Sequence, residues 1–259
     1  MPVHFSILLI EPPGIDSEVL KVMLAPEKFR VESAENGIQA WNLIQEGDPP
    51  DLVVIDVDLP QKGSIRVGGI QLLQLINQKQ GWREVPKIIL TSTPDSDMLK
   101  KIPTDSIEAV IIKPYDPMRF MNEVYDSLSR QLERHINEVN QQHIQLAGML
   151  HELIELTDQR TEKSLQYNKF KQFLAILELH FNLEEQFMSQ HHFSMLIEHS
   201  KNHQLMLETV NIMFNDVMSG RHTLSREDLE QIKQAIFGDV NDDKDYIDFL
   251  QNIRLELMA

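Results

Sequence analysis

Four positions in the first half of the chain combine reactive side chains with the ends of short apolar runs. They are Glu11, Asp56, Thr91 with its neighbour Ser92, and Lys113. If the runs are parallel strands, their carboxyl ends meet at one edge of a sheet and bring these groups together. Two carboxylates, a hydroxyl pair and a lysine could hold Mg²⁺ and a phosphoryl group. Any one alone would mean little, because loops at strand ends are solvated.

A second group of side chains has the spacing of metal ligands on helices. His180 and Glu184 are four residues apart, as are His199 and His203, and His143 lies earlier in the chain. Residues four apart share one face of a helix. Imidazole and carboxylate ligands without thiolate suit iron, and helix bundles build di-iron sites from facing helices. A lone pair would be read as a solvated helix face, but two pairs and a third histidine indicate convergence.

The elements that position the first group alternate in type. All 12 prolines lie between Pro2 and Pro117, and seven of the 10 glycines fall in that part. Continuous apolar runs of strand length alternate with helical patterns, which predicts a doubly wound α/β sheet. The expected strands cover residues 6–10, 52–55, 87–90 and 109–112, and the expected helices include residues 38–44 and 70–76.

The elements that position the second group are long helices. Residues 161–190 and 194–218 are periodic segments, Gly220 is a helix end, and Ser225 with Asp228 resembles a helix start. Short connections between such helices predict an antiparallel four-helix bundle. We expect domains at residues 1–128 and 129–259, joined by a continuous helix, with a kink near 129–134 as the alternative.

Length and composition limit the function classes. The 259 residues suggest two domains, and the formal net charge of −16 disfavours nucleic acid and anionic membrane surfaces as partners. The absence of cysteine removes disulfides and sulfur-ligated metals. No apolar run has the length of a membrane span and no signal peptide opens the chain, so a cytoplasmic location is expected.

The first part resembles the receiver domain of two-component response regulators over residues 4–128. That resemblance implies a flavodoxin-like fold with Asp56 as phosphoryl acceptor, Lys113 as a phosphate contact and Thr91 as the hydroxyl that responds to phosphorylation. It also implies Mg²⁺ bound by Glu11, Asp56 and the backbone carbonyl of Asp58. The stretches that carry it are Asp56-Val-Asp-Leu-Pro60, Ile89-Leu-Thr91-Ser92, Ile112-Lys113-Pro114 and Ser33-Ala-Glu-Asn-Gly37.

Three departures from the receiver pattern stand out. The acidic pair after the first strand is here Glu11-Pro12, so one metal carboxylate is missing. The aromatic residue expected three positions before the lysine is Val110, and the loop at 61–69 is longer than usual. With Val110 there, a smaller conformational response to phosphorylation is expected.

The second part resembles hemerythrin-like proteins over roughly residues 131–250. The likeness rests on His180-Phe181-x-x-Glu184-Glu185-x-x-Met188, on His199-x-x-x-His203, and on His143 with Leu146 and Leu153. It implies two irons, one bound by His143 and His180, the other by His199 and His203, with Glu184 as a bridge.

The last helix departs from this pattern. The family places a histidine five residues before a bridging aspartate, but five residues before Asp243 stands Gly238. Asp239 lies four residues before Asp243 and is a candidate substitute for the missing histidine. Because this histidine ligand is missing, the second iron site is expected to be weaker. The other histidines of this half are interpreted as surface residues: His135, His151, His191, His192 and His222.

Two hypotheses from different classes follow. The first is a response regulator, phosphorylated by a histidine kinase or small phosphodonor, coupled to a di-iron module that binds or senses O₂, another redox species or iron. The second is a pseudo-receiver adaptor with a metal-poor bundle that acts by protein contacts. A signalling or binding protein is favoured over an enzyme, while an oxidase- or peroxidase-like di-iron activity and a homodimer are both left open. Metal content and an absorption spectrum discriminate between the two.

Overall fold

A computed structural model describes residues 5–25, 29–60, 67–93, 107–237 and 240–258, with side chains in the last segment described for residues 245–257. The chain divides into two compact units, centred on residues 2–132 and 133–255. We call the first the α/β unit and the second the helical unit. The division falls within α5 (Pro117–Asp158), which contributes to both.

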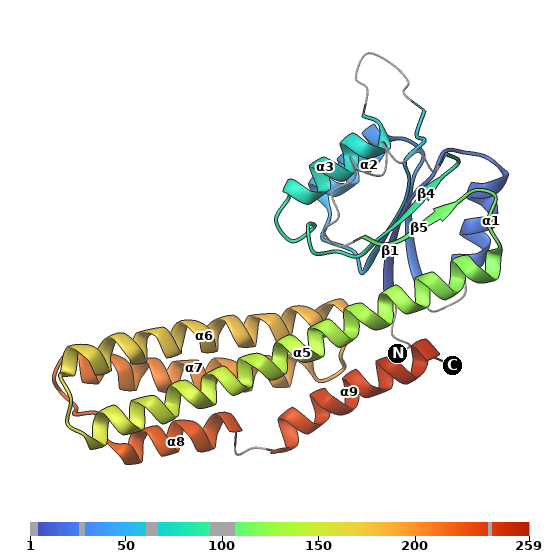
Figure 1. Ribbon diagram of the computed structural model, residues 1–259. Coiled ribbons are helices and arrows are strands. Elements are labelled where there is room, and N and C mark those ends of the chain that lie inside the picture. Colours follow the sequence, from blue (N-terminus) through green and yellow to red (C-terminus); the bar gives the residue numbers. More distant parts are fainter. Residues whose placement is uncertain (1–4, 26–28, 61–66, 94–106, 238–239, 259) are drawn as a thin grey trace. The chain divides into compact units, whose positions relative to one another are not determined.

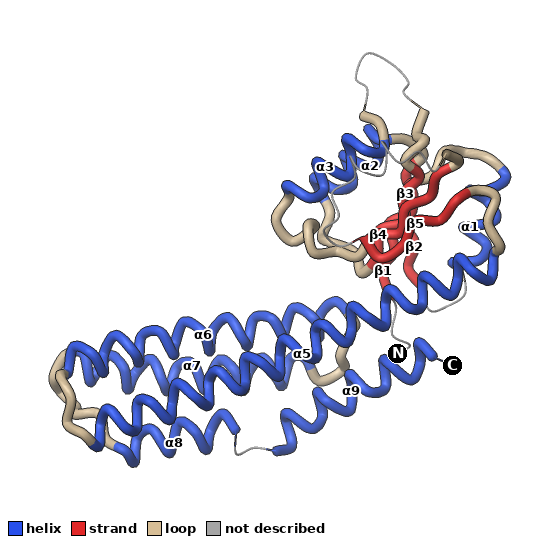
Figure 2. Tube along the Cα trace, in the orientation of Figure 1, coloured by secondary structure: helices blue, strands red, loops and turns tan. Residues whose placement is uncertain are grey.

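The α/β unit is built on a five-stranded parallel sheet of order β2-β1-β3-β4-β5 (Figures 1 and 2). This order is that of flavodoxin-like doubly wound folds, so the predicted fold of this part is confirmed. The strands are β1 (Phe5–Ile10), β2 (Phe29–Ala34), β3 (Leu52–Asp56), β4 (Lys87–Thr91) and β5 (Ile107–Ile112). The helices between them are α1 (Ile15–Leu24), α2 (Gly37–Glu46) and α3 (Gly69–Gln78).

Burial explains why the central strands read as continuous apolar runs. Every residue of β3 and β4 is buried, as expected for strands covered on both faces. Side chains of α2 and α3 pack with these strands in one core. Its members from the two helices include Ala40, Ile44, Leu72 and Ile76. The sheet therefore holds the ends of β1, β3 and β4 in fixed register.

Two local features set the approach of the helices to the carboxyl edge of the sheet. The Asn36 side chain accepts hydrogen bonds from the backbone N–H groups of Ile38 and Gln39 and so starts α2. At the start of α3, a Cβ on Gly69 would lie 2.4 Å from Cα of Val57 and 2.7 Å from the carbonyl oxygen of Asp56. Only glycine allows α3 to approach the end of β3 this closely.

The helical unit contains the rest of α5 and four further helices. These are α6 (Lys163–Gln190), α7 (Leu196–Met218), α8 (Arg226–Phe237) and α9 (Val240–Met258). Buried side chains from α5, α6, α7 and α8 form one apolar core, which includes Leu150, Phe173, Val210 and Ile232. Where one last helix was expected, the described residues form two, α8 and α9. None of the described helices has both the length and the apolar composition needed to span a bilayer.

The predicted start of the last helical region is confirmed as a capping box. The Asp228 carboxylate accepts hydrogen bonds from the Ser225 N–H (2.8 Å) and hydroxyl (2.7 Å), and the Asp228 N–H donates to the Ser225 hydroxyl (3.2 Å). Burial raises the pKa of Asp228, but its hydrogen bonds to Ser225 and His222 outweigh this and hold the pKa below its usual value. Gly220 after α7 has a φ of 73°, as expected for a helix end.

Asp228→Ala should reduce the stability of the helical unit by about 1 kcal/mol, because the N–H and hydroxyl of Ser225 lose their acceptor in the capping box. The depressed pKa means that this contribution is present above pH ~4 and is lost as pH falls through the lower folded-state pKa. Urea unfolding followed by far-ultraviolet circular dichroism measures it. Glu227→Ala, in the same helical turn, is the control. Both tryptophans, Trp41 and Trp82, lie in the α/β unit, so an equal shift in their fluorescence would contradict a local effect.

Candidate functional site

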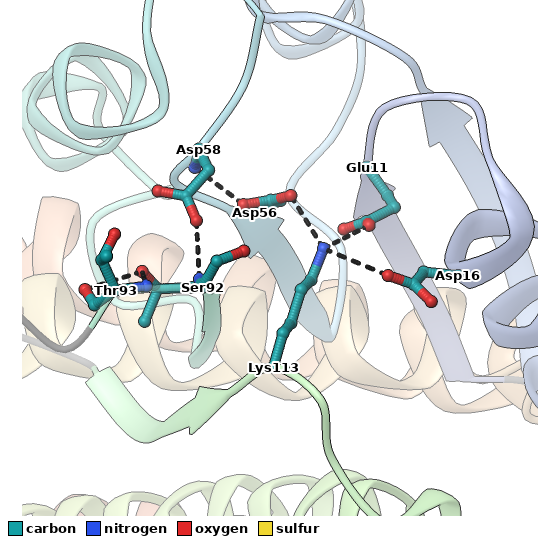
Figure 3. A network of polar contacts seen from close by, with 8 residues as sticks. Glu11, Asp16, Asp56, Asp58, Ser92, Thr93 and Lys113 are labelled. Atoms are coloured by element: carbon teal, nitrogen blue, oxygen red, sulfur yellow. Dashed lines mark hydrogen bonds and ion pairs between the residues drawn. The ribbon is translucent and has the colours of Figure 1, made fainter.

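Three predicted residues meet at the carboxyl edge of the sheet. Nζ of Lys113, which follows β5, lies 2.6 Å from Oε1 of Glu11 after β1 and 2.9 Å from Oδ2 of Asp56 at the end of β3 (Figure 3). Both carboxylates are buried, at 4% exposure each. One ammonium therefore faces two buried carboxylates, and when both are ionised one negative charge is left uncompensated among these three groups.

Electrostatics at this edge favour a further cation. Burial raises the pKa of Glu11 to about 7 against the hydrogen bond from Lys113, and the charge of Asp56 adds to the increase. Burial lowers the pKa of Lys113, but its hydrogen bonds to Asp56 and Glu11 outweigh this and raise it above the usual value. Among the described residues, the buried Oε2 of Glu11 has no hydrogen-bond partner. Carboxylate oxygens at such a position match the ligand preference of Mg²⁺.

The loops after β3 and β4 are joined by backbone hydrogen bonds. The Asp58 N–H donates to Oδ1 of Asp56 (2.7 Å), and Oδ2 of Asp58 accepts from the Ser92 N–H (2.6 Å). The buried Thr91 hydroxyl donates to the carbonyl of Thr93 (3.1 Å). Asp58 thus lies beside Asp56 as expected, whereas the Thr91 hydroxyl is held by its own loop.

Asp16 is a residue of this site that sequence reasoning missed. Its Oδ2 lies 4.0 Å from Nζ of Lys113, and Figure 3 shows it beside Glu11. The side chain stands in the first turn of α1 and is 64% exposed. Its only sequence signal is its position in the loop-to-helix segment after β1, which also carries Glu11.

A second constellation lies in the helical unit around Glu184 of α6. Oε1 of Glu184 faces Nε2 of His180 at 3.5 Å and Nε2 of His143 at 3.9 Å. Its Oε2 faces Nε2 of His203 at 3.5 Å and Nε2 of His199 at 3.6 Å. Glu184, His180, His199 and His203 are buried, and His143 is half-buried. Each carboxylate oxygen therefore shares one potential metal position with two imidazoles.

Outer hydrogen bonds fix the orientation of two imidazoles. Nδ1 of His203 lies 2.8 Å from Oε1 of Glu185, and a carboxylate can only accept, so Nδ1 carries the proton. Nδ1 of His180 pairs in the same way with the Gln142 amide oxygen at 3.0 Å. In a ring whose one proton is on Nδ1, the Nε2 lone pair is then directed at Glu184.

Lone pairs of nitrogen and carboxylate oxygen at about 3.5 Å suit a cation between them. Burial, followed by the neighbouring histidines, lowers the pKa of His180 to about 3, so its ring stays neutral near pH 7. Among the described residues, the buried Nε2 of His199 also has no hydrogen-bond partner. Imidazole nitrogen with carboxylate oxygen is a donor set that suits iron.

An aromatic and imidazole cluster borders this constellation. The Tyr246 hydroxyl lies 2.5 Å from Nε2 of His135, whose ring stacks on Phe187 at a centroid distance of 3.8 Å. The ring centroid of Phe187 lies 4.3 Å from that of His191. The interpretation of His191 as a surface residue is wrong, because it is 1% exposed, and His135 is half-buried. Their positions in the sequence carry no ligand spacing, so no signal distinguished them from exposed histidines.

Comparison with known proteins bears on the α/β unit. The sequence model of the family described as "Response regulator receiver domain" matches residues 7–125. Residues 7–125 form a response regulator receiver domain. The response regulator GtcR of Aneurinibacillus migulanus is 30% identical over 129 residues, which cover 49% of each chain. The response regulator Rre1 of Synechocystis is 30% identical over 128 residues, which cover 49% of this chain and 52% of that protein.

The chain spans about half the length of these two curated relatives. Among solved structures, the signal receiver domain of an HD domain-containing protein from Pseudomonas fluorescens is 26% identical. It covers 49% of this chain and 97% of its own, with a TM-score of 0.44.

The structure brings most of the predicted site residues into two groups. In the receiver domain Glu11, Asp56 and Lys113 touch, with Asp58 adjacent to Asp56. In the helical unit the four histidines surround Glu184. The expected ligand Asp239 lies outside the described residues, as does the side chain of Asp243.

The buried environment of His135 predicts a pH dependence of stability. Burial and the charge of His191 lower its pKa to about 4 in the folded chain, from 6.5. Between these values the unfolded chain binds more protons, so stability is intact above pH ~6.5 and falls as pH decreases towards 4. This one group accounts for up to about 3 kcal/mol. Unfolding of the metal-free chain at several pH values measures it. His135→Phe should flatten the profile in this window, whereas His151→Ala, at an exposed position, should not; equal profiles for all three proteins would refute the assignment.

Proposed function

We propose that the chain is a two-component response regulator, phosphorylated on Asp56, whose helical unit is a hemerythrin-like di-iron module. The contact of Lys113 with both Glu11 and Asp56 supports the phosphoryl part of this proposal. The position of Glu184 between two pairs of imidazoles supports the metal part. The two parts are argued and tested separately.

In the phosphoryl reaction, a carboxylate oxygen of Asp56 attacks the phosphorus of a phosphohistidine or small phosphodonor. A new O–P bond forms while the donor's bond to phosphorus breaks, and the leaving group departs in line. The Lys113 ammonium, 2.9 Å from Asp56, neutralises charge on the phosphoryl oxygens. Mg²⁺, held by Glu11, Asp56 and the carbonyl of Asp58, would neutralise the remaining charge.

Asp16 offers a replacement for the carboxylate that Pro12 removes from the receiver pattern. It is the acidic group of α1 nearest to Lys113 among the described contacts, at 4.0 Å. An exposed carboxylate at this distance can hold a magnesium-bound water without direct ligation, since Mg²⁺ keeps several waters in protein sites. We infer that Asp16 contributes to Mg²⁺ affinity from this outer position.

Incubation with a small phosphodonor and millimolar Mg²⁺ should produce an acyl phosphate on Asp56, and Asp56→Asn should abolish it. Asp16→Asn should raise the Mg²⁺ concentration needed for half-maximal labelling by about threefold, because one partly exposed charge contributes less than about 1 kcal/mol. Intact-protein mass spectrometry and radiolabel from the donor measure the yield. Glu18→Gln, which removes the other acidic group in the first turn of α1, is the control. Lack of any acyl phosphate in the wild-type chain would contradict the proposal that Asp56 is phosphorylated.

The helical unit is proposed to be an antiparallel four-helix bundle of the hemerythrin type, with α8 and α9 together supplying the last helix. One iron would bind between Oε1 of Glu184 and the rings of His143 and His180, and the other between Oε2 and the rings of His199 and His203. Asp243 is proposed as the second bridge and Asp239 as the substitute for the missing histidine. A carboxylate-bridged iron pair would supply an open position for O₂, another small redox ligand or iron exchange.

The chain's own residues determine how this metal site is held. Glu185 and Gln142 accept from the two Nδ1–H groups and so keep Nε2 of His203 and His180 directed inward. Partners of this kind typically account for 10- to 100-fold in metal affinity. Burial by Phe181, whose ring stacks on His203 at 3.8 Å, limits access of water to that side.

The chain should bind close to two irons, and Glu184→Ala should lose most of both, because one carboxylate serves both positions. Glu185→Ala should weaken iron binding by about tenfold or more through loss of the His203 orientation alone. Metal analysis after anaerobic loading, with titration of Fe²⁺, measures both effects. Glu178→Ala, an exposed acidic position on the same helix, should bind iron like the wild type. Full iron retention by Glu184→Ala would overturn the bridged assignment.

A second candidate function is a pseudo-receiver adaptor with a metal-poor bundle. It is favoured by the valine at 110, which is only partly buried against the core, and by the Thr91 hydroxyl bonded to Thr93. Such a protein would act through its surfaces alone. Iron-free purified protein that also accepts no phosphoryl group would identify this function.

A further inference from the structure

Tyr246 and His135 form a hydrogen-bonded pair beside the Glu184 constellation. The phenolic oxygen of Tyr246 on α9 lies 2.5 Å from Nε2 of His135 on α5. The tyrosine is 2% exposed. The phenol is the donor, because the imidazole is neutral: burial and the charge of His191 lower the pKa of His135 to about 4. The pair is therefore a buried O–H group already aligned on a neutral base.

Neighbouring rings hold this pair in place. Phe187 lies face to face with His135 at 3.8 Å and 11°, and His135 meets the edge of Tyr246 at 88°. The ring centroid of Phe249 lies 6.5 Å from that of Tyr246. Aromatic packing fixes the donor and acceptor orientation and limits contact with water.

The pair is also close to the proposed metal ligands. The Tyr246 ring centroid lies 6.2 Å from that of His199, whose Nε2 faces Glu184. The hydrogen bond from the phenol to Nε2 of His135 gives the phenolic proton an acceptor, so loss of an electron from the tyrosine can be accompanied by transfer of its proton.

We propose that Tyr246 is a redox-active tyrosine that donates one electron to the metal site, with His135 as its proton acceptor. This inference rests on the proposed metal site and adds a function for residues outside the ligand set. The geometry that carries it is the 2.5 Å phenol–imidazole bond together with the 6.2 Å separation from His199.

Hydrogen peroxide is the oxidant class on which such a donor would act. Reduction of peroxide to two waters requires two electrons, which a ferrous pair would supply by itself. The second iron position is expected to be the weaker one, and a site loaded with one ferrous ion supplies only one electron. With Tyr246 as the second donor, Fe²⁺, the phenol, His135, H₂O₂ and two protons give Fe³⁺, the neutral phenoxyl, protonated His135 and two waters. The phenolic O–H bond breaks and an N–H bond forms on His135.

Rapid mixing of the iron-loaded chain with hydrogen peroxide, followed by freezing and electron paramagnetic resonance, tests the proposal. The wild-type chain should give a tyrosyl radical, and Tyr246→Phe should remove it. His135→Phe should slow radical formation by about 100-fold, the usual contribution of a positioned proton acceptor. Tyr167→Phe, a partly buried tyrosine of α6 packed against the apolar core, is the matched control and should keep the signal. Iron content is measured first in every variant.

A metal-free arm separates failure of this inference from failure of the metal site. Flash oxidation of the metal-free chain by a ruthenium polypyridyl photo-oxidant should give a long-lived tyrosyl radical, because a buried phenoxyl is shielded from water. That component should disappear in Tyr246→Phe and persist in Tyr167→Phe. A long-lived radical in a chain that binds no iron would overturn the metal site while supporting the redox pair. Absence of this component, or its survival in Tyr246→Phe, overturns the inference whatever the iron content.

Discussion

Burial of a carboxylate among apolar side chains costs several kcal/mol unless positive charge or hydrogen-bond donors compensate for it. Both units of this chain contain such a carboxylate, and the elements around each are arranged to compensate it. In the receiver domain, Asp56 stands at the end of a fully buried strand and is compensated by the ammonium of Lys113. In the helical unit, Glu184 is 2% exposed and is surrounded by four imidazoles. The two solutions differ in completeness, because the lysine carries a permanent charge, whereas burial keeps the ring of His180 neutral near pH 7.

That difference determines what each site requires. In the receiver domain, one ammonium compensates part of the negative charge of two carboxylates, so the remaining charge is small. Mg²⁺ and a phosphoryl group then add positive and negative charge together. In the helical unit, Nε2 of His180 faces Oε1 of Glu184 at 3.5 Å, and the low pKa of His180 means that protonation of this ring does not compensate the carboxylate near pH 7. A divalent cation on each side of Glu184 is the direct form of compensation. Metal binding would accordingly be coupled to the stability of this unit.

The sequence predicted the features that depend on local pattern. Continuous apolar runs predicted β3 and β4. Ser225 with Asp228 predicted a helix start, and the structure has the corresponding capping-box hydrogen bonds. The proximity of Glu11, Asp56 and Lys113 was predicted from one topological rule, namely that the carboxyl ends of parallel strands lie at one edge of the sheet. The four-residue spacings on α6 and α7 predicted which histidines would face Glu184.

Features that depend on tertiary contacts were not predictable in this way. Asp16 approaches Lys113 only because α1 begins directly after the β1 loop. His135 and His191 have no ligand spacing. His135 contacts Phe187 of α6 and Tyr246 of α9, two elements distant from it in the sequence, whereas His191 lies against Phe187 at the end of its own helix. Spacing along one helix records which residues share a face, but not which face of another helix they meet.

The histidines of the helical unit illustrate how one residue type is given opposite roles by its neighbours. Glu185 can only accept, so His203 must donate from Nδ1 and presents a lone pair at Nε2 to Glu184. Tyr246 offers a phenol that ionises only at high pH, so the neutral His135 accepts at Nε2 and keeps its own proton on Nδ1. The first arrangement prepares a nitrogen to bind a cation, and the second prepares a nitrogen to receive a proton. Because both are set by hydrogen bonds outside the ligand set, the chemistry of this unit is specified as much by Glu185 and Tyr246 as by the residues that would touch the metal.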